Sequence, residues 1–116
     1  MNKNVLEKDS LIKRLVSKFN LEKSIEKVIL FGSYSNGNID EFSDIDLLII
    51  LKNQSKAKSR DELIKRKLFY KTLLSKDFPV PLDVIVYTKE EWEKLKKLNT
   101  SFIKEIKETG KVIYER

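Results

Sequence analysis

Two short polar motifs at a fixed separation carry the chemistry that this sequence can perform. Gly32-Ser33 is followed by ten residues and then by Asp44-Ile45-Asp46. Glycine lets a backbone approach a ligand closely, and a serine beside free N–H groups at a helix start attracts phosphate. Two carboxylates supply the oxygen ligands that Mg²⁺ prefers, usually together with substrate phosphates. The two motifs therefore predict a site for a metal ion and a phosphorylated substrate.

Each motif adjoins an apolar run that is typical of a buried strand. Residues 28–31 lead into the glycine and serine, and residues 47–51 follow the two aspartates. Side chains alternate between the faces of a strand, so Asp44 and Asp46 project from one face, about 7 Å apart. We expect strands at about 27–31 and 44–51 and a short helix after Ser33 that ends near Gly37.

The segment Phe31-Gly32-Ser33, ten residues, Asp44-Ile45-Asp46-Leu47-Leu48-Ile49 resembles the signature of the DNA polymerase beta-like nucleotidyltransferase superfamily. Within it, the chain is most similar to the minimal nucleotidyltransferases (MNT), which are about as long. The resemblance implies an α/β (α+β) fold of the polymerase beta-like kind, with a mixed β-sheet and helices largely on one face. It covers nearly the whole chain, so we expect one domain over residues 1–116. It also implies a third carboxylate at the start of a later strand, and Asp83 fits because it begins an apolar run after Pro81.

The same resemblance implies roles for these residues. Nucleotidyl transfer attacks the α-phosphorus of a nucleoside triphosphate and releases pyrophosphate, with two Mg²⁺ ions as cofactors and ATP as substrate. Asp44 and Asp46 would bridge the metal ions, and Asp83 would complete the catalytic one and accept the proton of the attacking hydroxyl. Gly32 and Ser33 would hold the β- and γ-phosphates.

A bare catalytic core suggests that a partner brings the acceptor. MNT proteins are the antitoxin half of HEPN–MNT toxin–antitoxin pairs, in which AMP passes from ATP to a tyrosine of the HEPN toxin, an RNase. The resemblance therefore predicts a Mg²⁺-dependent protein adenylyltransferase antitoxin that forms a hetero-oligomer with a HEPN toxin.

One departure from the family pattern concerns charge. Many members place an arginine within a few residues of the glycine–serine pair, whereas residues 34–38 here contain no basic side chain. Two alternatives follow: the affinity for triphosphate is lower than in those members, or a lysine from the Lys52–Lys58 loop or a group of a partner chain substitutes.

Two other functions remain open from the sequence. In the first, the chain is a binding protein that neutralises its partner by occlusion without catalysis. In the second, it is a stand-alone nucleotidyltransferase for a small molecule or RNA. Residues 52–76 carry a charge of +7 within a chain whose net charge is +6, which is compatible with nucleic acid, but the segment shows no evident platform for base stacking.

Composition narrows the chemistry further. The chain lacks cysteine and histidine, which excludes disulfides and zinc–thiolate sites and leaves carboxylates to do any acid–base work. No apolar run reaches the length of a membrane span, and no apolar signal region follows the N-terminus. We therefore expect a cytoplasmic protein without a membrane partner.

The remaining elements follow from caps and periodicity. Ser10 is expected to cap a first helix with Leu11, Leu15 and Phe19 on one face. Ser59 and Glu62 form a capping-box pattern for a helix to about residue 74, with four side chains turned inward: Leu63, Ile64, Leu68 and Phe69. A strand at about 82–87, a second capping box at Thr88–Glu91, a helix that stops at Gly110 and an edge strand near 112–114 complete the prediction.

Overall fold

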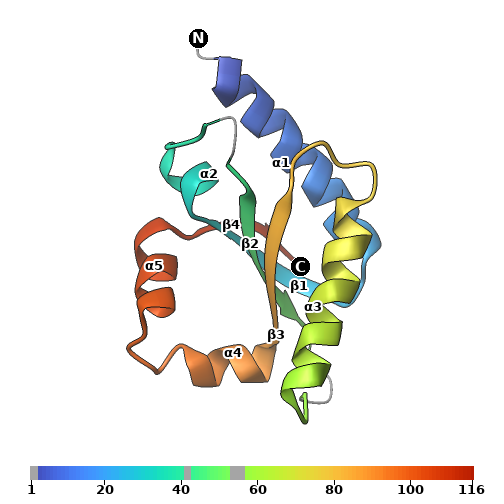
Figure 1. The fold of residues 1–116 in the computed structure, drawn as a ribbon, viewed down its shortest axis with the longest axis vertical. Coiled ribbons are helices and arrows are strands. Elements are labelled where there is room, and N and C mark those ends of the chain that lie inside the picture. The colour runs from blue at the N-terminus through green and yellow to red at the C-terminus, as the bar shows by residue number, and fades with distance from the viewer. Residues whose placement is uncertain (1–2, 41–42, 53–56) are drawn as a thin grey trace.

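The computed structural model describes residues 3–40, 43–52 and 57–116 (Figure 1). Its elements follow the chain in this order: α1 (Lys3–Leu21), β1 (Ile25–Phe31), α2 (Ser33–Asn36), β2 (Ile45–Leu51), α3 (Arg60–Ser75), β3 (Leu82–Thr88), α4 (Lys89–Leu95), α5 (Ser101–Thr109) and β4 (Lys111–Glu115). The polar loops predicted at 38–43 and 53–58 lie partly outside the described residues.

The four strands form one mixed sheet, as predicted. Their order is β3-β2-β1-β4, with β1 antiparallel to both β2 and β4, and β2 parallel to β3. A parallel pair needs a crossover connection, and α3 makes it between β2 and β3. The predicted edge strand near 112–114 is β4, and β3 forms the opposite edge.

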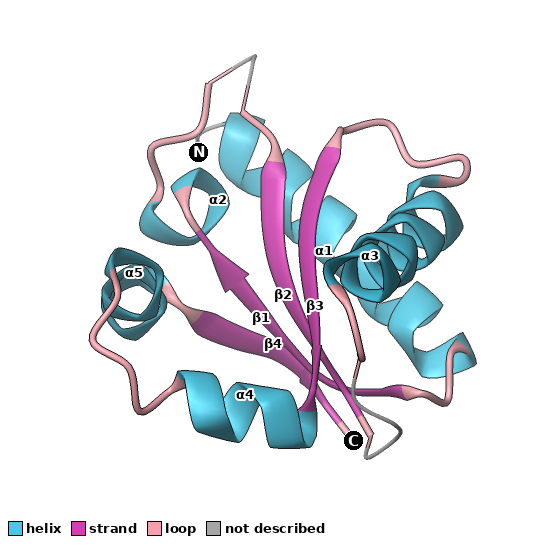
Figure 2. Cartoon of the chain, turned by 60° about the horizontal axis from the view of Figure 1, so that its bottom comes forward, coloured by secondary structure: helices cyan, strands magenta, loops and turns pink. Residues whose placement is uncertain are grey.

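Helices pack on both faces of the sheet, so the expectation that they lie largely on one face was wrong (Figure 2). The two long helices lie on one face, where Leu15 and Phe19 of α1 and Tyr70 and Leu74 of α3 join the larger core. On the other face, α4 and α5 bury Trp92, Ile103 and Ile106 against a smaller core. Strand β2 contributes to both cores, which explains the unbroken apolar run from Leu47 to Leu51.

Helix α1 begins earlier than predicted. It starts at Lys3, so Ser10 lies inside the helix and the prediction that it caps the N-terminus was wrong. No glycine or proline between residues 3 and 10 would stop the helix. The inward face was predicted correctly, since Leu15 and Phe19 are fully buried.

Helix α3 turns a different face inward than predicted. Ile64, Leu68 and Phe69 are exposed, and Leu63 alone of the four predicted residues is half-buried. The buried positions are Tyr70 and Leu74, and the Tyr70 hydroxyl is 2.6 Å from Ser24 Oγ. The helix therefore packs along positions 63, 66, 70 and 74, a seam that includes an arginine and a tyrosine.

The caps confirm most of the predicted boundaries. Ser59 accepts a hydrogen bond from the Glu62 N–H, but the Glu62 carboxylate accepts from the Lys58 N–H, so this box is only half formed. Thr88 and Glu91 form the full capping box of α4. Gly37 ends α2 in the left-handed conformation at φ 87°. In the part of the chain that the structure describes, no helix is both long and apolar enough to cross a membrane.

Candidate active site

Strand pairing brings the two sequence motifs and Asp83 to one end of the sheet. Because β1 runs antiparallel to β2, the C-terminal end of β1 lies beside the start of β2, and β3 starts at the same end because it runs parallel to β2. In register, Phe31 pairs with Asp46, and Asp46 pairs with Asp83. Gly32, Asp46 and Asp83 therefore follow one another across three neighbouring strands.

Gly32 and Asp46 are in close contact. Gly32 has φ +71° and ψ −151°, a conformation that side chains rarely allow. A Cβ atom at this position would overlap the Asp46 Oδ2 atom and lie 3.1 Å from its Cγ. The glycine is thus needed both for its backbone conformation and for the space that the Asp46 carboxylate occupies.

The end of α5 holds the glycine–serine turn. The Gly32 N–H donates to Thr109 Oγ1 at 3.3 Å, and Thr109 Oγ1 donates to the Glu105 carbonyl at 3.0 Å. The buried Ser35 hydroxyl donates to the Thr109 carbonyl oxygen. Sequence reasoning did not identify Thr109, because nothing local distinguishes it from an ordinary residue at a helix end.

Ser33 opens the four-residue helix α2. It is partly exposed, and its hydroxyl has no hydrogen-bond partner within residues 3–40, 43–52 and 57–116. This hydroxyl is therefore available to a ligand at the same end of the sheet as the carboxylates.

Negative charge concentrates around Asp46. Burial, and then the charges of Asp83, Glu105 and Asp44, raise the pKa of the Asp46 carboxyl from its ordinary value of 3.8 to about 6. Glu105 comes from α5 and was not predicted, because only the fold brings it near β2. The three predicted aspartates thus belong to one electrostatic cluster.

A cation lies beside the cluster. Lys67 Nζ of α3 is 3.9 Å from Asp83 Oδ1, and both side chains are about half exposed. The loop at 52–58, from which a substitute cation was expected, lies partly outside the described residues. Within them, Lys67 is a cation near the carboxylates that the sequence did not single out.

The carboxylates of this site suit a divalent cation that is bound jointly by the protein and by the phosphates of a substrate. Asp46 and Asp83 lie side by side, whereas Asp44 is exposed just before β2. Within the described residues, no three acidic side chains form a ready-made metal-binding group. Mg²⁺ needs no such cage, because it is commonly bound by one or two carboxylates together with substrate phosphates and water. Burial and then the neighbouring negative charges raise the pKa of Asp46, and a bound cation would offset both effects.

The fold and this site define a class of enzyme. The chain belongs to the nucleotidyltransferase domain family, whose pattern it matches over residues 8–113. Two relatives from Methanocaldococcus jannaschii are named "Putative protein adenylyltransferase MJ0141" and "Putative protein adenylyltransferase MJ0604". They are 34% and 36% identical over 90 residues each, which is 78% of this chain and 80% and 79% of theirs.

A solved structure has the same fold. It is a toxin–antitoxin structure with AMP-PNP, which aligns with a TM-score of 0.61 and 16% identity over 90% of this chain and 73% of that chain. The predicted polymerase beta-like nucleotidyltransferase fold and the resemblance from which it came are confirmed.

Proposed function

We propose that this chain is a Mg²⁺-dependent protein adenylyltransferase that acts as an antitoxin by transferring AMP from ATP to a tyrosine of a partner HEPN toxin. The names of the two relatives support protein adenylylation, and the solved toxin–antitoxin structure supports the biological setting. The observation that carries the proposal is the succession of Gly32, Asp46 and Asp83 across three paired strands.

Each residue has a role in this proposal. The Ser33 hydroxyl and the turn at Gly32 hold the β- and γ-phosphates of ATP. Asp44, Asp46 and Asp83 are the metal ligands, with Asp46 central because it contacts Gly32 on one side and pairs with Asp83 on the other. Mg²⁺ bound there would neutralise the negative charge that develops on the phosphates during transfer.

The reaction exchanges one phosphorus–oxygen bond for another. The tyrosine oxygen bonds to the α-phosphorus, the bond from that phosphorus to the pyrophosphate oxygen breaks, and the phenolic proton passes to the Asp83 carboxylate. Asp83 is suited to accept it because the chain contains no histidine and because this carboxylate is half exposed at the edge strand β3.

The order of residues across the sheet matches the geometry of the reaction. The attacking and leaving oxygens lie roughly in line on opposite sides of the phosphorus. Gly32 lies on one side of Asp46 and Asp83 on the other. Pyrophosphate would therefore leave on the side of β1, and the acceptor would approach on the side of β3.

Transfer to a partner tests the proposal directly. The purified chain is incubated with labelled ATP and Mg²⁺, with and without the protein encoded by the neighbouring gene, and labelling and intact mass are followed. We expect the partner to gain the mass of one AMP group on a tyrosine, and the Asp46→Asn variant to lose this transfer. A complex that forms without transfer, and that still neutralises the partner after Asp44→Asn and Asp46→Asn are combined, would instead identify a protein that acts by occlusion.

A further inference from the structure

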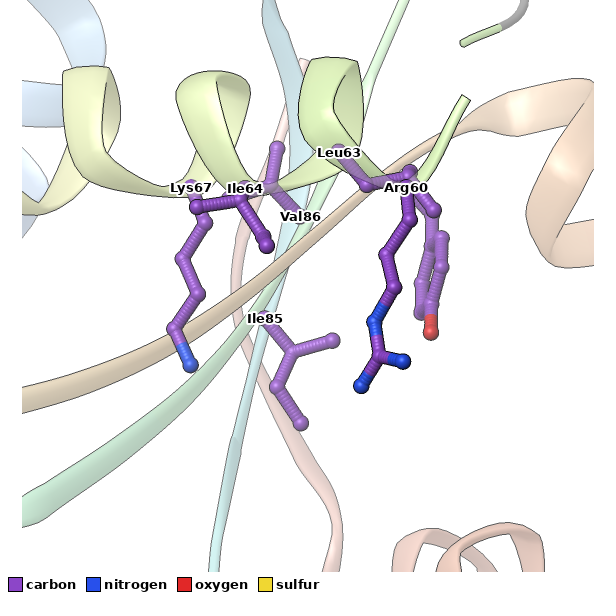
Figure 3. A pocket seen from close by; sticks show the side chains of 7 residues that line it. Arg60, Leu63, Ile64, Lys67, Ile85 and Val86 are labelled. Atoms are coloured by element: carbon purple, nitrogen blue, oxygen red, sulfur yellow. The ribbon is translucent and has the colours of Figure 1, made fainter. Parts of the chain in front are cut away.

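A hollow of about 290 Å³ lies between α3 and the edge strand β3, outside the group of carboxylates (Figure 3). Helix α3 contributes Arg60, Leu63, Ile64 and Lys67 to its lining, and β3 contributes Ile85 and Tyr87. None of these six residues belongs to the motifs that predicted the nucleotidyltransferase site.

Two cations converge on this hollow. Figure 3 shows Arg60 and Lys67 extending from α3 toward the same side, with the Ile85 side chain between them. Seven positions separate the two residues, so they lie two helical turns apart, about 10 Å along the axis. Within the described part of the chain, the Arg60 guanidinium has no ion-pair partner. The hollow thus offers two positive groups to a ligand.

The floor between the cations is apolar. Ile64 is 48% exposed on α3, and Ile85 and Tyr87 are partly exposed on β3. A ligand that fits here combines negative groups with apolar surface, as a segment of a protein does. A nucleic acid strand would need cations at every few ångströms along a track of phosphates, whereas this hollow has one at each end.

The hollow adjoins the site on the side where the acceptor arrives. Lys67 lines the hollow and also lies 3.9 Å from Asp83, the proposed proton acceptor. Asp83, Ile85 and Tyr87 alternate along β3 and therefore project from the same face. A segment bound in the hollow would hold its neighbouring residues against Asp83.

We propose that the hollow between α3 and β3 binds an acidic segment of the acceptor protein and so positions the acceptor hydroxyl at Asp83. This inference rests on the proposed function, because it identifies the acceptor side of the same reaction. A second copy of this chain is a poor occupant, since residues 52–76 carry a charge of +7 and would meet their own like charge.

Nuclear magnetic resonance titration tests the inference without depending on catalysis. The ¹⁵N-labelled full chain is titrated with a synthetic peptide that has a tyrosine between two pairs of acidic residues, and with a matched peptide in which lysines replace them. We expect the acidic peptide to shift the amide signals of Arg60, Lys67, Ile85 and Tyr87, and to keep doing so in saturating ATP and Mg²⁺. The lysine peptide should leave these signals unchanged.

Two matched charge reversals on α3 distinguish binding in the hollow from a general effect of the net charge of the protein. Arg60→Glu should weaken binding of the acidic peptide about fivefold or more, whereas Lys65→Glu should change it less than about twofold. Lys65 is exposed on the same helix but does not line the hollow, and both substitutions change the net charge equally. The spectra themselves report whether each variant is folded, and Arg60→Gln provides a milder second variant.

Several results would overturn the inference. These are an acidic peptide that shifts no signal of the hollow, equal weakening by the two charge reversals, displacement of the peptide by ATP, or tighter binding of a short oligouridylate at the same residues. Labelled ATP added to the same samples distinguishes the two proposals. If the acidic peptide binds but no acceptor is labelled, the proposed transfer is rejected and the docking site stands. If both peptides are labelled equally, the transfer stands and the docking site is rejected.

Discussion

The Asp46 carboxylate occupies the space that a side chain on Gly32 would fill. The Cβ atom of any other residue at position 32 would overlap Asp46 Oδ2, so the last turn before α2 and the first carboxylate of β2 are sterically coupled. The glycine of the glycine–serine motif therefore fixes the position of the Asp46 carboxylate as well as the shape of its own turn.

This coupling predicts the effect of Gly32→Ala. The added methyl group must displace Asp46 or the turn, and the positive φ adds strain, so we expect destabilisation of about 1–3 kcal/mol and loss of most nucleotidyl transfer. Urea unfolding and ATP-dependent labelling would measure the two effects. Gly37→Ala is the control, because its φ is also positive but its Cβ would meet nothing within 4 Å. Full activity in Gly32→Ala would contradict the coupling.

The raised pKa of Asp46 predicts a pH dependence of the metal-free protein. Since the native pKa is about 6 and the ordinary value is 3.8, the native state favours the protonated carboxyl. Its stabilising contribution is present below pH 3.8 and is lost as the pH rises through about 6. We expect Asp46→Asn to be more stable than the wild type above pH 7, by about 1–2 kcal/mol after allowance for solvent screening. The difference should vanish near pH 4, and urea unfolding at several pH values would measure it.

A divalent cation should offset the loss of stability that the charged Asp46 carboxylate causes above pH 7. Mg²⁺ added with a non-hydrolysable ATP analogue would bind the charged carboxylates of the native state and should raise Tm at pH 7.5. Asp46→Asn should show little of this increase, and EDTA should abolish it in the wild type. The analogue alone, tested with EDTA present, separates phosphate binding from metal binding. An equal increase in Asp46→Asn would count against metal binding at this carboxylate.

The hydrogen bonds between Thr109 of α5 and the turn at Gly32 predict that Thr109 positions this turn. Thr109→Val removes the hydroxyl that accepts from the Gly32 N–H, at nearly the same volume. We expect a loss of about 1 kcal/mol in stability and a higher KM for ATP with a smaller change in kcat. Thr109→Ser restores the hydroxyl and should rescue the KM. A Thr109→Val enzyme with an unchanged KM would show that the turn holds its shape alone.

A partly buried ion pair between α3 and α4 predicts a loss of stability away from the site. Arg66 Nη1 of α3 lies 2.6 Å from Glu91 Oε1, and Glu91 also accepts from the Ala57 and Thr88 N–H groups. Burial alone would raise the pKa of Glu91, but these hydrogen bonds and Arg66 hold it below its ordinary value. Glu91→Ala should therefore cost about 2–3 kcal/mol, since it leaves the arginine and two amides without their acceptor. Chemical denaturation would measure this loss, and Glu90→Ala on the exposed side of α4 is the comparison.

The sequence predicted the strands, and the positions of the two polar motifs at their ends, well because both are encoded locally. The apolar runs that form β1 and β2 are too short for a typical buried helix, so they predict strands. Glycine, serine and aspartate adjoin these runs directly. Asp83 was identifiable because it also begins an apolar run. The family resemblance added the expectation that these three segments meet, which strand register bears out.

Other parts of the site depend on contacts between distant segments. Glu105, Thr109 and Lys67 reach the carboxylates or the glycine turn only after α5 and α3 have packed, and their local sequences resemble ordinary helix surface. The inward face of α3 was misassigned for a related reason. Counting apolar side chains favoured Leu68 and Phe69, whereas the helix buries Tyr70 and most of Arg66, which are amphipathic.

The burial of β2 on both faces divides the site into a fixed part and adjustable parts. Its residues from Leu47 to Leu51 are at most 3% exposed, so this strand moves only if both cores open. Asp46 is therefore anchored, while Ser33 lies on a four-residue helix and Asp83 on an edge strand. Slow amide exchange should be confined to β2 and β1. Small adjustments of the site to a substrate would occur at Ser33 and Asp83, on either side of Asp46, rather than at Asp46 itself.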